Sequence, residues 1–140
     1  MHGDVDRVRT QNERFYDAVS HRNLLSMESL WAHSEYVRCV HPGAPLLVGW
    51  NSVRESWRGL FERSIVMTAR PKEIKVIVIG PTALVTCRES TSSFTLEGST
   101  AYCSETTNVF EKVSGEWYLI HHHASLVSKA GDDFWLGSLE

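Results

Sequence analysis

The sequence predicts an α+β fold in which three N-terminal helices pack in the concave face of a strongly curved, mainly antiparallel sheet. Apolar residues recur at helical spacing over roughly the first sixty residues, and strand-like segments separated by short turns follow. The last three of these segments run about a dozen residues each, which is too long to stay flat in a chain of 140 residues because sheets twist. Helices followed by a meander of strands are typical of an α+β domain. We therefore expect a cone-shaped roll with a cavity at its open end.

The helices are predicted from the spacing of apolar residues and from capping residues. The first should begin near Asp4, the second should use Asn23 as its N-cap, and the third should use Asn51. The three expected buried faces carry Val5, Val8, Asn12, Phe15, Tyr16 and Val19; then Leu24, Met27, Leu30 and Trp31; then Val53, Trp57, Leu60 and Phe61.

Five segments read as strands. They are residues 35–43, 73–80, 82–96, 100–113 and 116–127. The first ends at Pro42-Gly43, and the last four are joined by turns at Gly80-Pro81, at residues 97–99 and at Ser114-Gly115. Neighbouring strands joined by such short turns must be antiparallel.

Composition excludes several classes of function. The net charge is -3 and the sequence has no basic run, so we expect no nucleic-acid partner. No apolar run approaches the ~20 residues that span a bilayer, so we expect no membrane partner. The N-terminus is too polar for a secretory signal, which favours a cytoplasmic location. Cys39, Cys87 and Cys103 have no paired spacing and are interpreted as small buried residues.

Two segments carry a family resemblance. The stretch "YVRCVHPGAPLLVGWNSVRESWRGLF" resembles the strand, loop and third helix of SnoaL-like domains, and "SETTNVFEKVSGEWYLIHHHAS" resembles their last hairpin. The chain is thereby identified as a SnoaL-like member of the nuclear transport factor 2-like, or ketosteroid isomerase-like, superfamily. The resemblance implies a cystatin-like roll over residues 1–127, which leaves residues 128–140 as a C-terminal tail.

The same resemblance leaves function open. Relatives include isomerases, dehydratases and cyclases, and also the non-catalytic association domain of calcium/calmodulin-dependent protein kinase II. That association domain implies pocket arginines where this chain has Asn108 and Ala124. We therefore do not expect a carboxylate to be held here in the same way, and function must be argued from the site.

The triple histidine lies on the last expected strand. Alternation puts His121 and His123 on one face with Trp117 and Leu119, and His122 on the other. The resemblance implies that His122 faces the pocket, although a bulge would invert this register. A His-x-His pair could bind zinc with His41 or Glu105, but no spacing fixes the third ligand, and we expect neither a metal nor a cofactor.

The other candidate catalytic residue besides His122 is His41. It lies at a strand end, where it could act as a general base or hydrogen-bond donor, or merely cap the turn. Arg88 and Glu89 are adjacent on one strand, so one faces inward; an outer ion pair with Glu105 is the plainer alternative.

Candidate ligand-binding residues combine polar groups with an apolar wall. Asn108 or Arg88 could polarise a carbonyl. The apolar candidates are Tyr16, Trp31, Trp57, Phe61 and Phe110, although aromatic stripes at helical spacing are more often ordinary core.

The sequence thus predicts a small-molecule-binding protein. If it is an enzyme, we expect cofactor-free isomerisation, dehydration or cyclisation of a small apolar metabolite by general acid/base catalysis. The alternative is a non-catalytic dimerisation or assembly module. In either case Trp117, Leu119, His121 and His123 are expected outward, where they would form a homodimer interface on the convex face.

Overall fold

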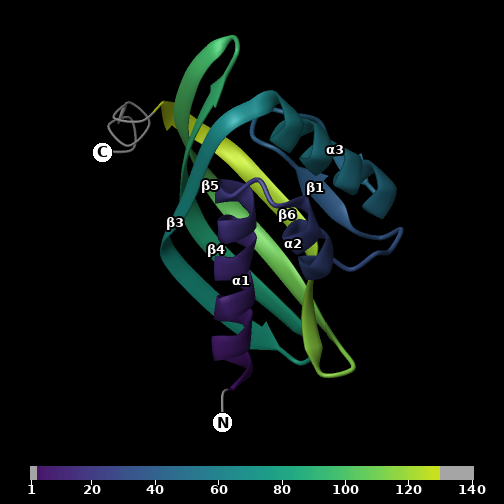
Figure 1. Ribbon diagram of the computed structural model, residues 1–140. Coiled ribbons are helices and arrows are strands. Elements are labelled where there is room, and N and C mark those ends of the chain that lie inside the picture. The colour runs from purple at the N-terminus through teal and green to yellow at the C-terminus, as the bar shows by residue number, and fades with distance from the viewer. Residues whose placement is uncertain (1–2, 130–140) are drawn as a thin grey trace.

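Three helices cover one face of a six-stranded sheet that curves around them and does not close (Figure 1). This computed structural model describes residues 3–129. The elements are α1 (Asp4–Ser20), α2 (Leu24–Leu30), β1 (Arg38–Val40), β2 (Leu47–Val48), α3 (Trp50–Arg63), β3 (Ser64–Ile79), β4 (Thr82–Thr95), β5 (Gly98–Val113) and β6 (Glu116–Lys129). The predicted fold class is confirmed.

The sheet has the strand order β2-β1-β6-β5-β4-β3. Strands β3 to β6 form a long antiparallel meander, and short β1 joins β6 in parallel before pairing with β2. In Figure 1 the meander sweeps past α1, while α2 and α3 lie toward the β1 side. The helices therefore cover the concave face, and side chains on that face are enclosed.

All three predicted helices are present, and the predicted starts of two of them are confirmed. Helix α1 begins at Asp4, and the Asn23 carboxamide accepts the Ser26 N–H at 3.1 Å at the start of α2. The predicted cap of α3 is wrong, because the helix begins at Trp50 and Asn51 lies inside its first turn. Gly49 occupies the cap position with φ +90°, a conformation that glycine adopts without a steric penalty.

Strand β3 begins at Ser64, whereas the sequence predicted its start at residue 73. Pro71 and the charged residues around it hide the first half of the strand from the alternation pattern. Proline is tolerated there because β3 is an edge strand of the sheet. The pairing with β4 also shifts between Lys72 and Lys75.

A bulge in β6 overturns the predicted faces of the last strand. Val109 of β5 pairs with His121, but Phe110 pairs with Leu119, so Ile120 is an extra residue. One extra residue reverses the alternation on one side of the bulge. Leu119 and Trp117 are consequently buried on the same face as His122, not outward with His121 and His123.

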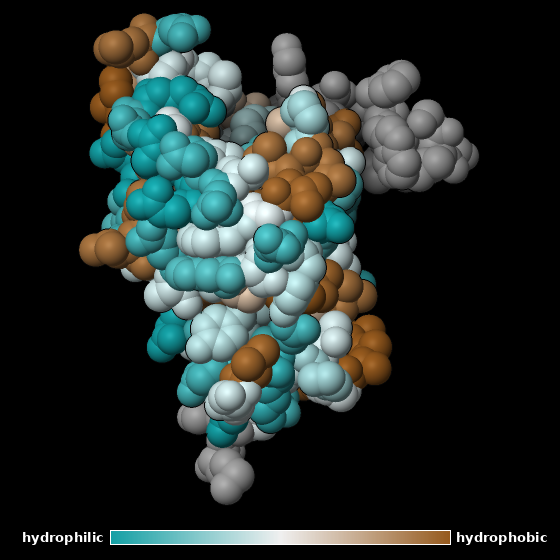
Figure 2. Space-filling view, turned by 90° about the vertical axis from the view of Figure 1, so that its right-hand side faces the viewer, coloured by the Kyte–Doolittle hydropathy of each residue, from teal (hydrophilic) through white to brown (hydrophobic). Residues whose placement is uncertain are grey.

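Trp117 closes the end of the core beneath α1. Its indole N–H donates to Asp4 at 3.0 Å, and the Gln11 amide donates to its carbonyl at 3.0 Å. On the face seen in Figure 2, hydrophobic residues form separate patches among hydrophilic ones.

Within residues 3–129, no helix has the length and apolar character needed to cross a membrane. Strand β6 continues to Lys129, and the rest of the predicted tail, residues 130–140, lies outside the described part of the chain.

Candidate functional site

A buried polar row crosses the middle of the concave face. Val85, Asn108, His122 and Cys39 are consecutive Cα partners on β4, β5, β6 and β1. Asn108 and His122 are 0% and 2% exposed. Because burial of polar groups is costly unless they are hydrogen-bonded, their partners decide what this row can do.

Asn108 is held by bonds at both ends of its side-chain amide. Its Nδ2 donates to Asn12 Oδ1 at 2.9 Å and to Tyr16 Oη at 3.3 Å. Its Oδ1 lies 2.6 Å from His122 Nδ1, which must then be the protonated nitrogen. Neutral His122 therefore carries its free lone pair on Nε2.

Glu89 supplies the only carboxylate among the buried residues of the described chain. The Tyr16 hydroxyl donates to Glu89 Oε2 at 2.5 Å. Since that bond uses the Tyr16 proton, Cys87, at 3.4 Å, donates its thiol hydrogen to Tyr16 Oη. His122 Nε2 lies 3.9 Å from Glu89 Oε2, which is too long for a direct hydrogen bond. We call Asn12, Tyr16, Glu89, Asn108 and His122 the buried network.

Burial shifts the proton affinities within the buried network in opposite directions. It raises the pKa of Glu89 to about 7, against the opposing effect of the Tyr16 hydrogen bond. It lowers the pKa of His122 well below its ordinary value, with positive charge at His41 as a smaller cause. The pKa of Tyr16 is raised by burial and by Glu89. Near neutral pH the site therefore has a neutral imidazole beside a carboxyl that can either accept or give a proton.

Aromatic rings surround the imidazole of His122. The ring centroids of Phe15 and Trp57 lie 4.9 and 5.9 Å from it, and Phe61 packs 5.8 Å from Trp57. The Trp57 indole N–H is buried and finds no partner within residues 3–129. The Ser104 hydroxyl, on the strand that pairs with Glu89, is unpartnered in the same described region. Buried polar groups usually have a hydrogen-bond partner, so these two groups are available to bind one.

His41 lies at the margin of the buried network. Its Nε2 is 2.8 Å from Ser56 Oγ, whose own hydrogen is donated to the Val53 carbonyl. Nε2 therefore carries the proton, and the ring packs edge-on to Trp57 at 4.6 Å. Burial lowers the pKa of His41 to about 4, with Arg63 contributing. A histidine with so low a pKa is a weak base at neutral pH.

Three of the predicted binding residues lie apart from the buried network. Arg88 is on the outer face and pairs with Glu105 at 2.6 Å, because alternation along β4 turns its neighbour Glu89 inward. The proposal that Arg88 polarises a ligand is thus corrected. The Trp31 indole N–H donates to Met27 Sδ at 3.3 Å, and Phe110 is fully buried opposite Leu119. Trp31 and Phe110 therefore belong to the core.

Sequence reasoning left Glu89 as one of two options and missed Asn12 as a polar partner. Asn12 lies on the apolar face of α1, and this position could have indicated its role. A side-chain amide buried among apolar residues needs a hydrogen-bond partner. Of the alternatives that the sequence left open, the structure shows the outer ion pair, between Arg88 and Glu105.

No group of three or more metal-binding side chains is found among residues 3–129. His121 and His123 lie outside the buried network, with ring centroids 6.0 Å apart. The absence of a metal requirement stays a prediction.

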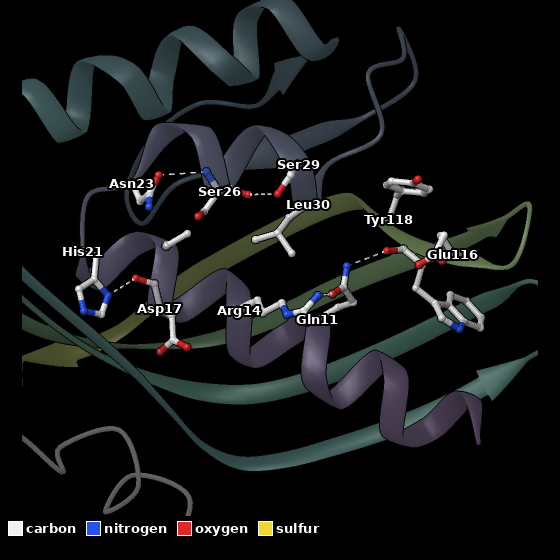
Figure 3. Close-up of a pocket in the computed structure, with 12 residues that line it drawn as sticks. Gln11, Arg14, Asp17, His21, Asn23, Ser26, Ser29, Leu30, Glu116 and Tyr118 are labelled. Carbon is white, nitrogen blue, oxygen red and sulfur yellow. Dashed lines mark hydrogen bonds between the residues drawn. The ribbon is translucent and has the colours of Figure 1, made fainter. Parts of the chain in front are cut away.

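Several surface grooves adjoin α1, and two of them are relevant to the buried network. One, of about 570 Å³, lies between α1, α2 and the start of β6; Figure 3 shows Gln11 and Arg14 on one wall and Asn23, Ser26 and Ser29 on another. The other, of about 580 Å³, lies between α1 and β3. Tyr16 lines this second groove and also belongs to the buried network, so the groove is a candidate approach to Glu89.

Comparison with solved structures supports the fold and the family. A candidate dehydratase of the NTF2-like family from Streptomyces avermitilis is 33% identical, with a TM-score of 0.82, over 89% of this chain and 96% of that one. A candidate calcium/calmodulin-dependent protein kinase type II association domain from Thiobacillus denitrificans is 26% identical, with a TM-score of 0.72, over 86% and 94%. A cystatin-like protein from Caulobacter vibrioides, 13% identical over 98% of both chains with a TM-score of 0.82, shares the fold.

Two curated relatives from Arabidopsis thaliana are an F-box protein and a probable F-box protein. The F-box protein SKIP8 of Arabidopsis thaliana is 29% identical over 83% of this chain. The chain spans 48% of that relative and 36% of a second Arabidopsis F-box protein, so it corresponds to half or less of either. A family model described as the SnoaL-like domain matches residues 8–129. Because this model matches most of the chain, the chain belongs to the SnoaL-like domain family of the nuclear transport factor 2-like superfamily.

Proposed function

We propose that this protein binds a small apolar metabolite on the concave face and transforms it by cofactor-free general acid/base catalysis, as an isomerase or dehydratase. The observation that carries the proposal is the Glu89 carboxyl, buried beside His122 and bonded to Tyr16 in an aromatic enclosure. A carboxyl with a pKa of about 7 can change protonation state at working pH, which general acid/base catalysis requires.

Glu89 replaces His41 and His122 as the proposed proton carrier. In an isomerisation, Glu89 carboxylate removes a proton from carbon beside a carbonyl, and the C–H electron pair forms an enolate. Protonated Glu89 then returns the proton to another carbon. In a dehydration, the same proton goes to the departing hydroxyl, which leaves as water. Neither sequence needs an oxidant, a reductant or a second substrate.

The remaining members of the buried network position Glu89 and His122. Every polar atom of the Asn108 side chain already has a protein partner, so Asn108 orients His122 and cannot polarise a ligand. The Tyr16 hydroxyl stabilises ionised Glu89 by hydrogen bonding. We retain Trp57 and Phe61 as residues that contact the ligand.

The 33% identical candidate dehydratase supports this class of chemistry because it covers nearly the whole domain. Solvent deuterium exchange offers a test that does not require the natural substrate. A panel of cyclic and aryl ketones would be incubated in deuterated buffer, and loss of the signals beside the carbonyl would be followed by NMR.

We expect at least one ketone to exchange faster with the wild-type protein than in buffer alone. Glu89→Gln should remove that acceleration by about a hundredfold. Glu105→Gln, which removes an exposed carboxylate on the adjacent strand, is the matched control and should retain it. Equal exchange with wild type and Glu89→Gln would contradict the catalytic proposal.

An assembly module is the second candidate function. The observation in its favour is the 26% identity with a candidate kinase association domain that is covered over 94% of its length. A homodimer is compatible with both functions, and we propose one through the outer face of the sheet. The cytoplasmic location stays a prediction.

A further inference from the structure

The buried network leaves a specific set of hydrogen-bonding groups unused. His122 Nε2 has a free lone pair because Nδ1 donates to Asn108. Glu89 receives a hydrogen bond at 2.5 Å from Tyr16, and the buried Thr106 hydroxyl also lowers the pKa of this carboxyl. A carboxylate has room for further hydrogen bonds. These two groups face each other across 3.9 Å, and both accept hydrogen bonds when Glu89 is ionised.

Trp57, one of the aromatic residues around His122, supplies a hydrogen-bond donor rather than an acceptor. Trp57 is 3% exposed, and its indole N–H, which can only donate, has no acceptor within residues 3–129. The Trp57 ring lies 5.9 Å from the His122 ring. One small molecule that contacts both rings could therefore meet acceptors on one side and a donor on the other.

The buried residues around the site include one acidic side chain and no basic one to balance it. Across residues 3–127, no lysine or arginine is buried, and Glu89 is the one buried acidic residue. Arg88, the nearest basic residue in sequence, points outward to Glu105. A ligand carboxylate would be placed beside Glu89 without a compensating cation, which is costly in a site of low polarity.

We propose that the concave site selects an uncharged ligand that carries both a hydroxyl and a carbonyl, and that it rejects carboxylates. The hydroxyl donates to Glu89 or His122 Nε2, and the carbonyl accepts from Trp57 Nε1–H. A hydroxyl placed beside the 3.9 Å gap can lie about 2.8 Å from both acceptors. This inference rests on the proposed ligand-binding function and narrows its substrate class.

Three aromatic compounds of similar size test separately the need for a hydroxyl and the rejection of a carboxylate. Benzoin has a hydroxyl and a ketone, deoxybenzoin has the ketone alone, and diphenylacetate has a carboxylate. Binding to the wild-type protein would be measured by isothermal titration calorimetry at about pH 8, where most Glu89 is ionised. We expect benzoin to bind about tenfold more tightly than deoxybenzoin, which corresponds to one added hydrogen bond to a charged or strongly polar group. Diphenylacetate should not bind measurably.

Two variants assign the contacts. Glu89→Gln should reduce the advantage of benzoin over deoxybenzoin, whereas Glu105→Gln, the exposed counterpart, should preserve it. Trp57→Phe keeps an aromatic ring but removes the N–H, so it should weaken both ketones by a similar factor of about ten. Circular dichroism would verify that each variant is folded.

The possible failures are distinguishable. Equal affinity of the wild-type protein for benzoin and deoxybenzoin would overturn the hydroxyl requirement, and tight binding of diphenylacetate would overturn the charge selection. Either result would leave the ligand-binding function standing. If none of the three probes binds, both this inference and the proposed binding of aromatic ketones are contradicted.

Discussion

At the scale of single residues, the position of Glu89 couples proton binding to folding. Its pKa rises from an ordinary 4.5 to about 7 in the folded protein because it is buried. Between these values the folded chain holds a proton that the unfolded chain has released. The stabilising contribution of this protonation is complete below pH 4.5 and is lost as the pH rises through 7.

Glu89→Gln should remove this dependence, because glutamine does not titrate. Relative to wild type, the free energy of unfolding of the variant should rise by roughly 3 kcal/mol between about pH 4.5 and 8. Urea denaturation across that range measures the difference, in which the titration of the histidines cancels. The curve for Glu105→Gln should run parallel to wild type. A parallel curve for Glu89→Gln would show that Glu89 titrates normally.

The histidines should differ sharply in their effect on stability. His122→Ala removes the donor to Asn108 Oδ1 and leaves a cavity at a site that is 2% exposed, so it should cost about 3 kcal/mol. His41→Ala loses the half-buried bond to Ser56 and should cost about 1 kcal/mol. His123→Ala, at an exposed position in the same strand, should change stability by less than about 0.5 kcal/mol.

Thermal denaturation of the three alanine variants gives this ranking directly. If His41→Ala were as damaging as His122→Ala, the bond between His41 and Ser56 would be a major structural contact and the expected ranking would be wrong.

At the scale of elements, the sequence predicts where β6 lies in the chain but not which of its side chains face the core. The composition predicted a strand from residue 116, and that is confirmed. The sequence contains no signal for the extra residue at Ile120, because isoleucine suits either a regular strand or a bulge. Only pairing with β5 determines that Leu119 and His122 share a face.

Chemical modification of the triple histidine tests this bulge. Diethyl pyrocarbonate reacts with accessible neutral imidazoles, so His123 should be labelled quickly, half-buried His121 more slowly, and His122 only after unfolding. Mass spectrometry of peptides from the native and urea-unfolded protein measures each rate, with the unfolded sample as the internal control. Rapid labelling of His122 in the native protein would contradict the register of β6.

The first residues of α2 and α3 also differ in whether the sequence could predict them. Asn23 was predictable because its side chain makes a local hydrogen bond within the α2 cap. The start of α3 was not, because it depends on the Gly49 N–H bonding to the Val37 carbonyl at 2.9 Å, a contact between distant residues. A sequence pattern can predict a hydrogen bond between neighbouring residues, such as the Asn23 cap. It cannot predict one that depends on the tertiary structure, such as the bond between Gly49 and Val37.

At the scale of the whole molecule, the candidate site is assembled from α1 and from strands β4, β5 and β6. Tyr16, Asn108 and His122 were predicted individually, and the fold brings them into one network. Their connection through Glu89 could not be predicted, because alternation leaves undecided which of two adjacent residues faces inward. The curvature of the sheet around α1 settles that choice.

The proposed homodimer requires a different surface from the one first expected. Trp117 and Leu119 are buried within one chain, so they cannot form the interface. A row of Cα partners instead crosses the outer face of the sheet: Ile77, Leu84, Val109, His121, Arg38 and Val48. Ile77 and Val48 are 56% and 49% exposed, which is a substantial apolar surface to leave in water.

This row should make dimerisation sensitive to acid. In the single chain the pKa of His121 is lowered by burial, and further by its neighbours His123 and Arg38. Further burial in an interface would favour neutral His121 still more strongly. Protonation near pH 5 would then place imidazolium beside Arg38 and against its counterpart in the second copy. The dimer should therefore be most stable above the ordinary histidine pKa and should dissociate as the pH falls.

Light scattering at low micromolar concentration should report a dimer near pH 7.5 and a rising monomer fraction toward about pH 5. Leu84→Asp places a carboxylate in the centre of the row and should yield a monomer at both pH values, since an unpaired charge at an interface core is strongly unfavourable. Leu25→Asp, which substitutes an equally apolar but 79% exposed residue on α2, should remain dimeric. A wild-type monomer at neutral pH would contradict the interface and would weigh against the assembly function, while the chemistry proposed for Glu89 needs only one chain.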